Sequence, residues 1–131
     1  MRLYLDAAPV IYTVEQVSPY AAVVDARLSA SGAVLVASDL TRMECRVKPL
    51  REGNADLLKD YDDYFEGAVA EIVTLSREVM DRATQIRAQY GFKTPDAIHL
   101  AAAVVSGCDV FLTNDYRLDR FTDIAIEVVQ P

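Results

Sequence analysis

The segment Thr94–Asp115, TPDAIHLAAAVVSGCDVFLTND, contains the two kinds of element that decide the fold of this chain. Its first part ends at Gly107 and repeats apolar residues at helical spacing, at Ala97, Ile98, Ala101, Ala102 and Val105. Residues 109–113 then form a short apolar run, which indicates a buried strand followed by Asp115. We expect Thr94 to cap the helix, which would leave the carboxylate of Asp96 free for other contacts.

The same alternation of strands and helices runs along the rest of the chain. Five strands are predicted, at residues 2–6, 33–37, 70–74, 109–113 and 124–128. Apolar and other residues alternate in the last of them, as in an edge strand. Helix boundaries are predicted at Pro9, Ser18–Pro19, Gly32, Ser38, Ser76 and Gly91, and Pro49 is predicted to mark either a helix end or a kink. The helix after Ser38 and the one after Gly53 are expected to form a hairpin. This pattern predicts an α/β fold with three layers, α/β/α, around a central, mainly parallel sheet of about five strands.

Length and composition indicate a single domain that covers residues 1–131. Although 52% of the residues are hydrophobic, no apolar run is long enough to span a bilayer. The apolar stretch that follows Met1 is too short for a signal peptide. Cys45 and Cys108 lack CxxC spacing, so neither a disulfide framework nor a zinc site is expected. We therefore expect a cytoplasmic protein that does not enter a membrane.

The formal net charge of −7 argues against a broadly basic nucleic-acid-binding surface. An enzyme can nevertheless hold RNA with a local basic rim, while a bound metal offsets part of the charge of its acids. The overall charge also favours a basic protein partner.

Four acids stand at places where folding does not require an acid: Asp6, Glu44, Asp96 and Asp115. Each acid alone has an ordinary explanation. Asp6 could cap a helix, and Glu44 could pair with Lys48. Asp96 could be favoured by a helix dipole, and Asp115 could be a turn residue. If the strands are parallel, however, all four carboxylates gather at the carboxyl edge of one sheet. Like charges repel there unless a cation joins them, so a divalent-metal site is the leading hypothesis.

The residue types in this set favour Mg²⁺ or Mn²⁺, which prefer oxygen ligands. His99 is the only histidine and lies three residues beyond Asp96, where it is a candidate either for the core or for a contact behind the metal ligands. The absence of a Gly-rich phosphate loop disfavours an NTPase. A receiver-like or haloacid-type phosphotransfer domain is disfavoured too, because Asp6-Ala7-Ala8 lacks the paired acid that such sites need after the first strand.

Several segments together carry a resemblance to a known family: Tyr4–Asp6 with Val10–Tyr12, Ser38–Glu44, Thr94–Ala103 and Phe111–Asp115. In this order they resemble the PIN-domain ribonucleases and, within them, the VapC-type toxins of bacterial toxin–antitoxin pairs. The resemblance implies a hydrolase, an Mg²⁺- or Mn²⁺-dependent endoribonuclease whose catalytic and metal-binding residues are Asp6, Glu44, Asp96 and Asp115. It also implies 5′-phosphate and 3′-hydroxyl products, with Thr113 assisting at the substrate. The pair Ala7-Ala8 departs from the pattern, since many relatives carry Ser, Thr or Asn there.

Basic residues near the acids are candidates for binding RNA phosphates. Arg42 and Arg46 lie beside Glu44 in a basic stretch that continues to Lys48 and Arg51. A second group flanks the other acids and consists of Lys93, Arg117 and Arg120. The RNA that is cut cannot be named from these residues, because none of them identifies a base.

The family likeness further implies a homodimer and a VapB-like antitoxin that lays an apolar and basic segment over the cleft. Tyr61, Tyr64 and Phe65 are candidates to receive this segment, although their helical spacing also predicts a core role. The alternative to an enzyme is a non-catalytic RNA- or protein-binding module that keeps the same fold.

Overall fold

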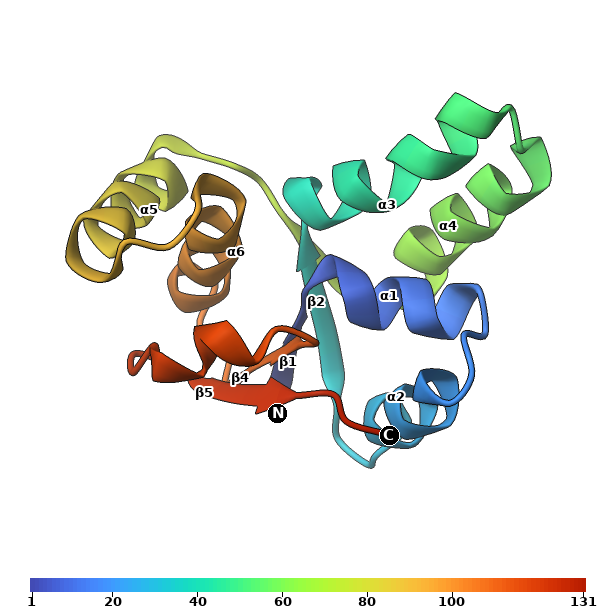
Figure 1. The fold of residues 1–131 in the computed structure, drawn as a ribbon, viewed down its shortest axis with the longest axis horizontal. Helices are drawn as coiled ribbons and strands as arrows, with labels where there is room; N and C mark the ends of the chain where they lie inside the picture. Colours follow the sequence, from blue (N-terminus) through green and yellow to red (C-terminus); the bar gives the residue numbers. More distant parts are fainter.

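A five-stranded sheet forms the centre of the protein, with the strand order β3-β2-β1-β4-β5 (Figure 1). The structure is a computed structural model that describes residues 1–131. The strands are β1 (Arg2–Leu5), β2 (Val34–Ser38), β3 (Glu71–Val73), β4 (Val110–Thr113) and β5 (Ala125–Val128). All four pairings between neighbouring strands are parallel. Each of the five predicted strands is confirmed to within one residue at either end, and β5 lies at an edge as expected.

Helices cover both faces of this sheet, which confirms the three-layer arrangement (Figure 1). In chain order they are α1 (Ala7–Val14), α2 (Tyr20–Leu28), α3 (Asp39–Glu52), α4 (Ala55–Gly67), α5 (Arg77–Tyr90), α6 (Thr94–Val105) and the 3₁₀ helix η1 (Tyr116–Arg120). One face is covered by α5 and α6, and the other by α1, α2 and α4. The predicted hairpin of α3 and α4 is present and projects from the sheet. None of the helices is both long and apolar enough to cross a bilayer.

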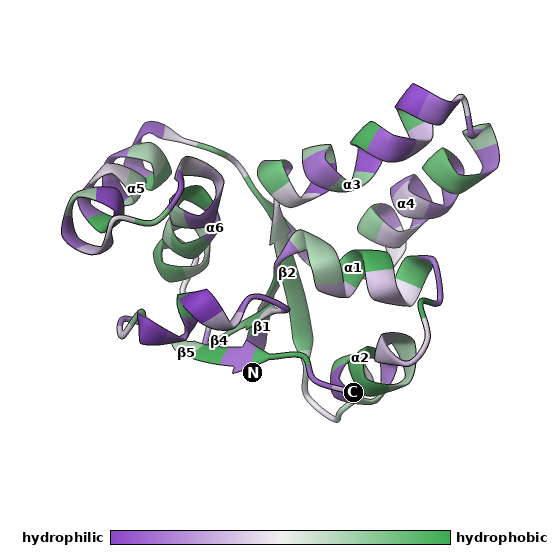
Figure 2. Cartoon of the chain, in the orientation of Figure 1, coloured by the Kyte–Doolittle hydropathy of each residue, from purple (hydrophilic) through white to green (hydrophobic).

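The pleat of the central strands divides the core into two parts. Tyr4 on β1 pairs in register with Val36 and Phe111, and these three side chains pack under α5 and α6. Their neighbours Leu5 and Leu112 point to the opposite face and pack with α1, α2 and α4. In Figure 2 the central strands are mostly apolar, while the helices mix apolar with hydrophilic residues. Side-chain alternation along a strand therefore supplies both halves of the core.

Most helix ends follow the capping rules, and α3 follows them closely. Ser38 closes β2 and forms a capping box with Thr41, and α3 ends at Gly53, whose φ of 64° is favourable for glycine. The prediction that Pro49 ends or kinks this helix is wrong as an end, because α3 continues through the buried Pro49 to Glu52. The helix predicted from Ser18 to Gly32 is shorter, since α2 spans only Tyr20–Leu28.

The prediction that Thr94 caps α6 is also wrong. Thr94 is already the first residue of the helix, and the N-cap position belongs to Lys93, which makes no side-chain cap bond. The hydroxyl of Thr94 instead accepts a hydrogen bond from Arg87 on α5, at 2.6 Å. A contact between two helices therefore replaces the local cap, and the sequence around Thr94 gives no sign of it.

The strand order reverses at β1 and β4, and we call the space beyond their carboxyl ends the crevice. From β1 the chain adds β2 and β3 on one side of the sheet, and it then returns to place β4 on the other side of β1. Ligand sites in open parallel sheets lie at such a reversal of strand order, beyond the carboxyl ends. Asp6 directly follows β1 there, and Thr113 ends β4.

Candidate metal centre and active site

Asp6 is anchored at the middle of this crevice. As the N-cap of α1, its Oδ1 accepts a hydrogen bond from the backbone of Ala7 at 2.8 Å. Its Oδ2 accepts a second bond from the hydroxyl of Thr113 at 2.7 Å, which ties the ends of β1 and β4 together. The side chain keeps 15% of its surface exposed. Capping and a role at the site are thus compatible, because the carboxylate still has lone pairs that face the crevice.

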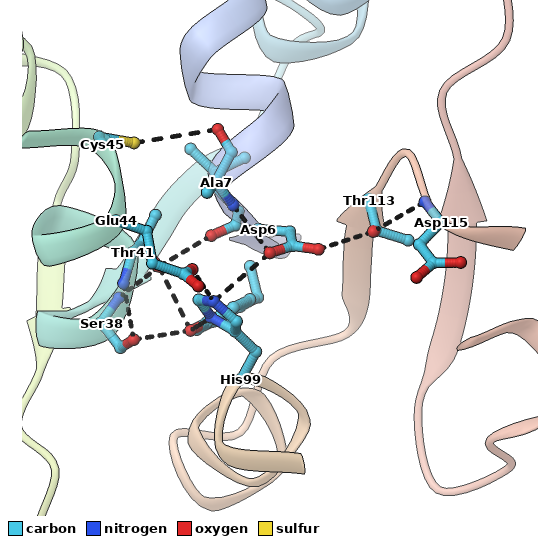
Figure 3. A network of polar contacts seen from close by, with 11 residues as sticks. Asp6, Ala7, Ser38, Thr41, Glu44, Cys45, His99, Thr113 and Asp115 are labelled. Carbon is cyan, nitrogen blue, oxygen red and sulfur yellow. Dashed lines mark hydrogen bonds and ion pairs between the residues drawn. The ribbon is translucent and has the colours of Figure 1, made fainter. Parts of the chain in front are cut away.

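Glu44 reaches the same place from the second turn of α3. Its Oε1 lies 2.5 Å from Nε2 of His99, and this nitrogen is 3.4 Å from Oδ1 of Asp6. Potential ligand atoms of these three residues all lie within 4.8 Å of one another, and Figure 3 shows them converging from α3, α6 and the end of β1. A carboxylate only accepts hydrogen bonds, so Nε2 of His99 carries the proton that it shares with Glu44.

His99 combines the two roles that the sequence left open. Its side chain is 2% exposed, as in a core residue, and it also contacts the acids of the crevice. On its other side, Nδ1 lies 2.8 Å from the hydroxyl of the buried Tyr4. Burial opposes the charged form, but the hydrogen bond to Glu44 and the nearby carboxylates outweigh it and raise the pKa of His99.

Asp96 lies in the first turn of α6, and its carboxylate makes no hydrogen bond. Burial, followed by the negative charges of Asp6 and Asp115, raises the pKa of Asp96. The crevice therefore contains carboxylates close enough to repel one another, which is the property expected of an acid cluster that holds a cation.

Asp115 stands apart from the tight group of Asp6, Glu44 and His99. It caps η1, and its carboxylate accepts hydrogen bonds from the backbone of Arg117 and, at 2.9 and 2.8 Å, from the Arg117 guanidinium. This hydrogen bonding lowers the pKa of Asp115. Its backbone is connected to Asp6 only through the hydroxyl of Thr113 (Figure 3). The sequence does not predict η1, because this helix has too few residues for a periodic signal.

The basic residues differ from one another in how far they are already neutralised. Arg42 and Arg46 on α3 both pair with Asp62 on α4, at 3.7 and 2.9 Å, across the helical hairpin. Lys48 likewise pairs with Glu15. Lys93, by contrast, is exposed and has no ion-pair partner.

Lys93 lines a cavity of about 310 Å³ beside Asp96. Its other lining residues include Phe92, Arg117 and Arg120. The Arg120 guanidinium lies 4.1 Å from the centre of the Phe92 ring and donates to the backbone oxygen of Tyr90, without a carboxylate partner. This side of the crevice therefore offers cations that no acid neutralises.

The aromatic residues of α4 do not form an open docking surface. Tyr61 and Phe65 are buried, with exposures of 0% and 4%, because they pack against β1 and β4. The prediction that they could receive a partner segment is wrong, and the alternative core role is confirmed. The exposed apolar residues near the site lie on α3 instead, at Met43, Val47 and Leu50.

The residues of the crevice fit a hard divalent cation. Asp6 and Glu44 present carboxylate oxygens within one small group, and Asp96 adds a carboxylate without a hydrogen bond. Such oxygen donors suit Mg²⁺ or Mn²⁺. His99 is the weakest candidate as a ligand, because Nε2 already donates its proton to Glu44.

A family model described as "PIN domain" matches residues 3–124 of the chain. The chain belongs to the PIN domain family. Among curated protein sequences, no match to this PIN domain is found.

Solved structures resemble this PIN domain over nearly its whole length. A chain in VapBC2 from Rickettsia felis, bound to a DNA fragment from its promoter, has a TM-score of 0.82 at 14% identity and covers 99% of this chain and 100% of its own. A chain in DNA-bound VapBC from Salmonella typhimurium has a TM-score of 0.72 at 19% identity, and the match covers 98% of each chain. VapC20 from Mycobacterium tuberculosis, described as a sarcin-ricin loop cleaving toxin, has a TM-score of 0.73 at 10% identity. This match covers 94% of this chain and 98% of VapC20. At these identities the likeness concerns the fold.

Proposed function

We propose that this PIN domain is a metal-dependent endoribonuclease and the toxin of a VapBC-type toxin–antitoxin pair. The observation that carries this proposal is the close grouping of Asp6 and Glu44 around His99, with Asp96 near enough to Asp6 for that charge, after burial, to raise its pKa. Membership of the PIN domain family supports a joint role for these acids in one metal-dependent site. The non-catalytic alternative does not explain why the fold places Asp96 where burial and the charges of Asp6 and Asp115 raise its pKa.

The acids divide the work of catalysis between them. Asp6 and Glu44 would hold Mg²⁺ or Mn²⁺, with Asp96 and Asp115 completing the acidic wall of the crevice. A bound cation would supply a Lewis acid that stabilises negative charge on the phosphodiester in the transition state. Asp96 is the carboxylate least engaged by hydrogen bonds, so it is the candidate to accept a proton from the attacking water. Thr113 would act indirectly, since its hydroxyl already orients Asp6.

The RNA strand is proposed to enter beside Asp96 rather than along α3. Arg42 and Arg46 are tied to Asp62, so they are weaker candidates for phosphate binding than the sequence suggested. Lys93 and Arg120 have no carboxylate partner and line the cavity next to Asp96. A strand whose phosphates contact these two side chains would bring the neighbouring phosphodiester toward the acids.

An antitoxin is the proposed partner, because related folds were solved in toxin–antitoxin complexes. Its apolar segment would cover the exposed stripe of Met43, Val47 and Leu50 on α3, which runs beside Glu44. The negative charge of the PIN domain would favour basic residues in that segment. We further propose a homodimer that acts in the cytoplasm.

The test is RNA cleavage by the purified protein after removal of any antitoxin. We expect cleavage of single-stranded RNA with Mg²⁺ or Mn²⁺, none with EDTA, and recovery when the metal is added back. The products should carry 5′-phosphate and 3′-hydroxyl ends. Cleavage that persists in EDTA, or that Asp6→Asn leaves at the normal rate, would show that the acids do not form a catalytic metal site.

A further inference from the structure

The imidazole of His99 lies beneath the acids, and both of its nitrogens have polar partners although only 2% of the side chain is exposed. Nε2 faces Glu44 at 2.5 Å and Asp6 at 3.4 Å. Nδ1 faces the hydroxyl of Tyr4 at 2.8 Å. A histidine that only filled the core would need neither carboxylate. This ring instead connects the interior of the sheet to the site.

A buried set of hydroxyls fixes the ring from behind. The hydroxyl of Tyr4, a fully buried residue, donates to Oγ of Ser38 at 2.8 Å and lies 3.4 Å from Oγ1 of Thr41. Thr41 in turn donates to the backbone oxygen of Leu5, at 3.1 Å. If the imidazole rotated, the hydroxyl of Tyr4 and Nδ1 of His99 would lose each other as partners while buried, which is unfavourable.

Glu44 depends on this ring more than Asp6 depends on any single partner. Its side chain is 32% exposed and has three rotatable bonds, and His99 supplies its only hydrogen bond. Asp6 has two anchors without His99, namely the backbone of Ala7 and the hydroxyl of Thr113. The N–H of His99 also stands near both carboxylates, where it reduces their mutual repulsion.

We propose that His99 is a positioning residue that holds the carboxylate of Glu44 beside Asp6, and that Tyr4 holds His99 in turn. This inference rests on the proposed function only in treating Glu44 as an acid of the metal centre. His99 would touch neither the metal nor the RNA, because Nε2 is occupied by the proton that it donates to Glu44. The sheet strand β1 thus supports Glu44 on α3 through a ring carried by α6.

The decisive measurement is Mn²⁺ binding, followed by the electron paramagnetic resonance signal of free Mn²⁺. Three variants probe the connection. His99→Leu removes both contacts of the ring, and Tyr4→Phe keeps the ring but removes the hydroxyl behind it, together with the contacts of that hydroxyl to Ser38 and Thr41. His99→Gln keeps an N–H that can face Glu44. Tyr64→Phe is the matched control, because its hydroxyl is buried but has no hydrogen-bond partner. Circular dichroism and thermal unfolding would establish that each variant is folded.

We expect His99→Leu to weaken Mn²⁺ binding by roughly 10–100-fold, the effect usual for residues that orient metal ligands. Tyr4→Phe should weaken it less, His99→Gln should recover part of the loss, and Tyr64→Phe should bind as the wild type does. In RNA cleavage, kcat should fall in the same order while KM stays constant, since His99 does not contact RNA.

Two results would overturn the proposal. One is a folded His99→Leu protein with the Mn²⁺ affinity of the wild type, which would make His99 a packing residue. The other is an unchanged Mn²⁺ affinity in Tyr4→Phe, which would show that Tyr4 does not hold His99 in place. This second result can be obtained even if His99→Leu does not fold. If the wild type binds Mn²⁺ but cleaves no RNA, the proposed nuclease function fails while the Mn²⁺ comparison still tests His99. A wild type that binds no Mn²⁺ would overturn both.

Discussion

The carboxylate of Asp96 is partly buried near Asp6 and Asp115 and receives no hydrogen bond. Burial and these two charges raise its pKa, so ionisation of Asp96 costs more in the folded protein than in the unfolded chain. We expect Asp96→Asn to raise the Tm of the metal-free protein at pH 7 by a few °C. The same change should lower kcat for RNA cleavage by about 10²–10⁴-fold. Calorimetry and a cleavage assay on one preparation would measure both effects.

The pH dependence of that Tm gain identifies its cause. An aspartate with a raised folded pKa stabilises the fold only while it is protonated, and that contribution is lost as the pH rises through the folded pKa. The gain from Asp96→Asn should therefore be present at pH 7 and should disappear toward about pH 3, where the carboxyl group is protonated in both states. Mg²⁺ should raise the Tm of the wild type more than that of Asp96→Asn. A gain that is the same at both pH values would point to a cause other than the carboxylate charge.

Tyr64 presents a simpler residue-level test of stability. Its hydroxyl is buried without a hydrogen-bond partner, and burial raises the pKa of Tyr64 to about 12. Removing an unpaired buried polar group removes its desolvation cost. We expect Tyr64→Phe to stabilise the protein by about 1 kcal/mol, seen as a higher urea midpoint with an unchanged m-value. A lower midpoint would mean that the hydroxyl has a partner in solution.

At this scale the sequence predicts which residues are acids of the site, but not what each of them contacts. Asp6 and Asp115 could be placed because they follow recognisable strands. The contact between Glu44 and His99 joins residues 55 positions apart, and no local pattern encodes it. Arg117 is visible two residues after Asp115, yet its guanidinium engages that carboxylate only because η1 forms.

Helix boundaries could be predicted from the sequence where a local capping rule decides them. The predictions were wrong where a tertiary contact decides the boundary. Ser38 and Ser76 cap α3 and α5 as expected, because their side chains bond to the first turn of the helix that follows. Thr94 failed as a cap because Arg87 engages its hydroxyl. Pro49 failed as a helix end because α3 continues through it to Gly53, where the chain turns into α4. The aromatic side chains of α4 could be assigned to the core only once the packing was known.

The segment that joins α5 to α6 carries the prediction about RNA. Lys93 is exposed beside Asp96 and has no carboxylate partner, and its side chain does not cap α6, so its loss should not disturb the helix. We expect Lys93→Ala to weaken binding of single-stranded RNA to an inactive Asp6→Asn protein. The slope of log K against log salt should shrink by roughly 0.7, as for one lost phosphate contact. Fluorescence anisotropy at several salt concentrations would give both values.

Two control variants make that result specific. Lys59→Ala removes an exposed lysine that is paired with Asp63 on α4 and should leave RNA binding unchanged. Arg42→Ala removes a cation that shares the carboxylate of Asp62 with Arg46, so it should have a smaller effect than Lys93→Ala. If Arg42→Ala weakens binding more, the strand runs along α3 and the path proposed here is wrong.

For the whole molecule, the fold class followed from sequence, whereas the strand order required the structure. Alternating strands and helices predict a parallel sheet with helices on both faces, and this is confirmed. The sequence does not state that β4 returns to pair with β1 on the side opposite β2. That return places Thr113 against Asp6 and thereby makes the crevice. The joint position of the acids is thus a property of topology, and their individual positions are properties of sequence.

The proposed toxin role predicts the effect of the whole molecule on a cell. We expect expression of the wild type in a bacterium to arrest growth, because a free endoribonuclease would destroy RNA that the cell needs. Asp6→Asn, expressed at the same soluble level, should permit growth, because it removes the negative charge of an acid of the site. Its amide oxygen can still accept from the backbone of Ala7, and its NH2 group can donate to the hydroxyl oxygen of Thr113. Co-expression of the proposed antitoxin, expected from an open reading frame beside the gene, should relieve the arrest.

The exposed apolar stripe on α3 distinguishes the antitoxin from other causes of relief. Val47→Glu places a charge on this stripe without touching Asp6, so the variant should still arrest growth, but the antitoxin should relieve the arrest poorly because the apolar contact is lost. Ser31→Glu adds the same charge on the exposed turn that precedes β2 and should leave relief intact. Normal growth at high soluble expression of the wild type would contradict the toxin role. Full relief of Val47→Glu would place the antitoxin on another surface, since a buried carboxylate without a partner would otherwise weaken the complex severely.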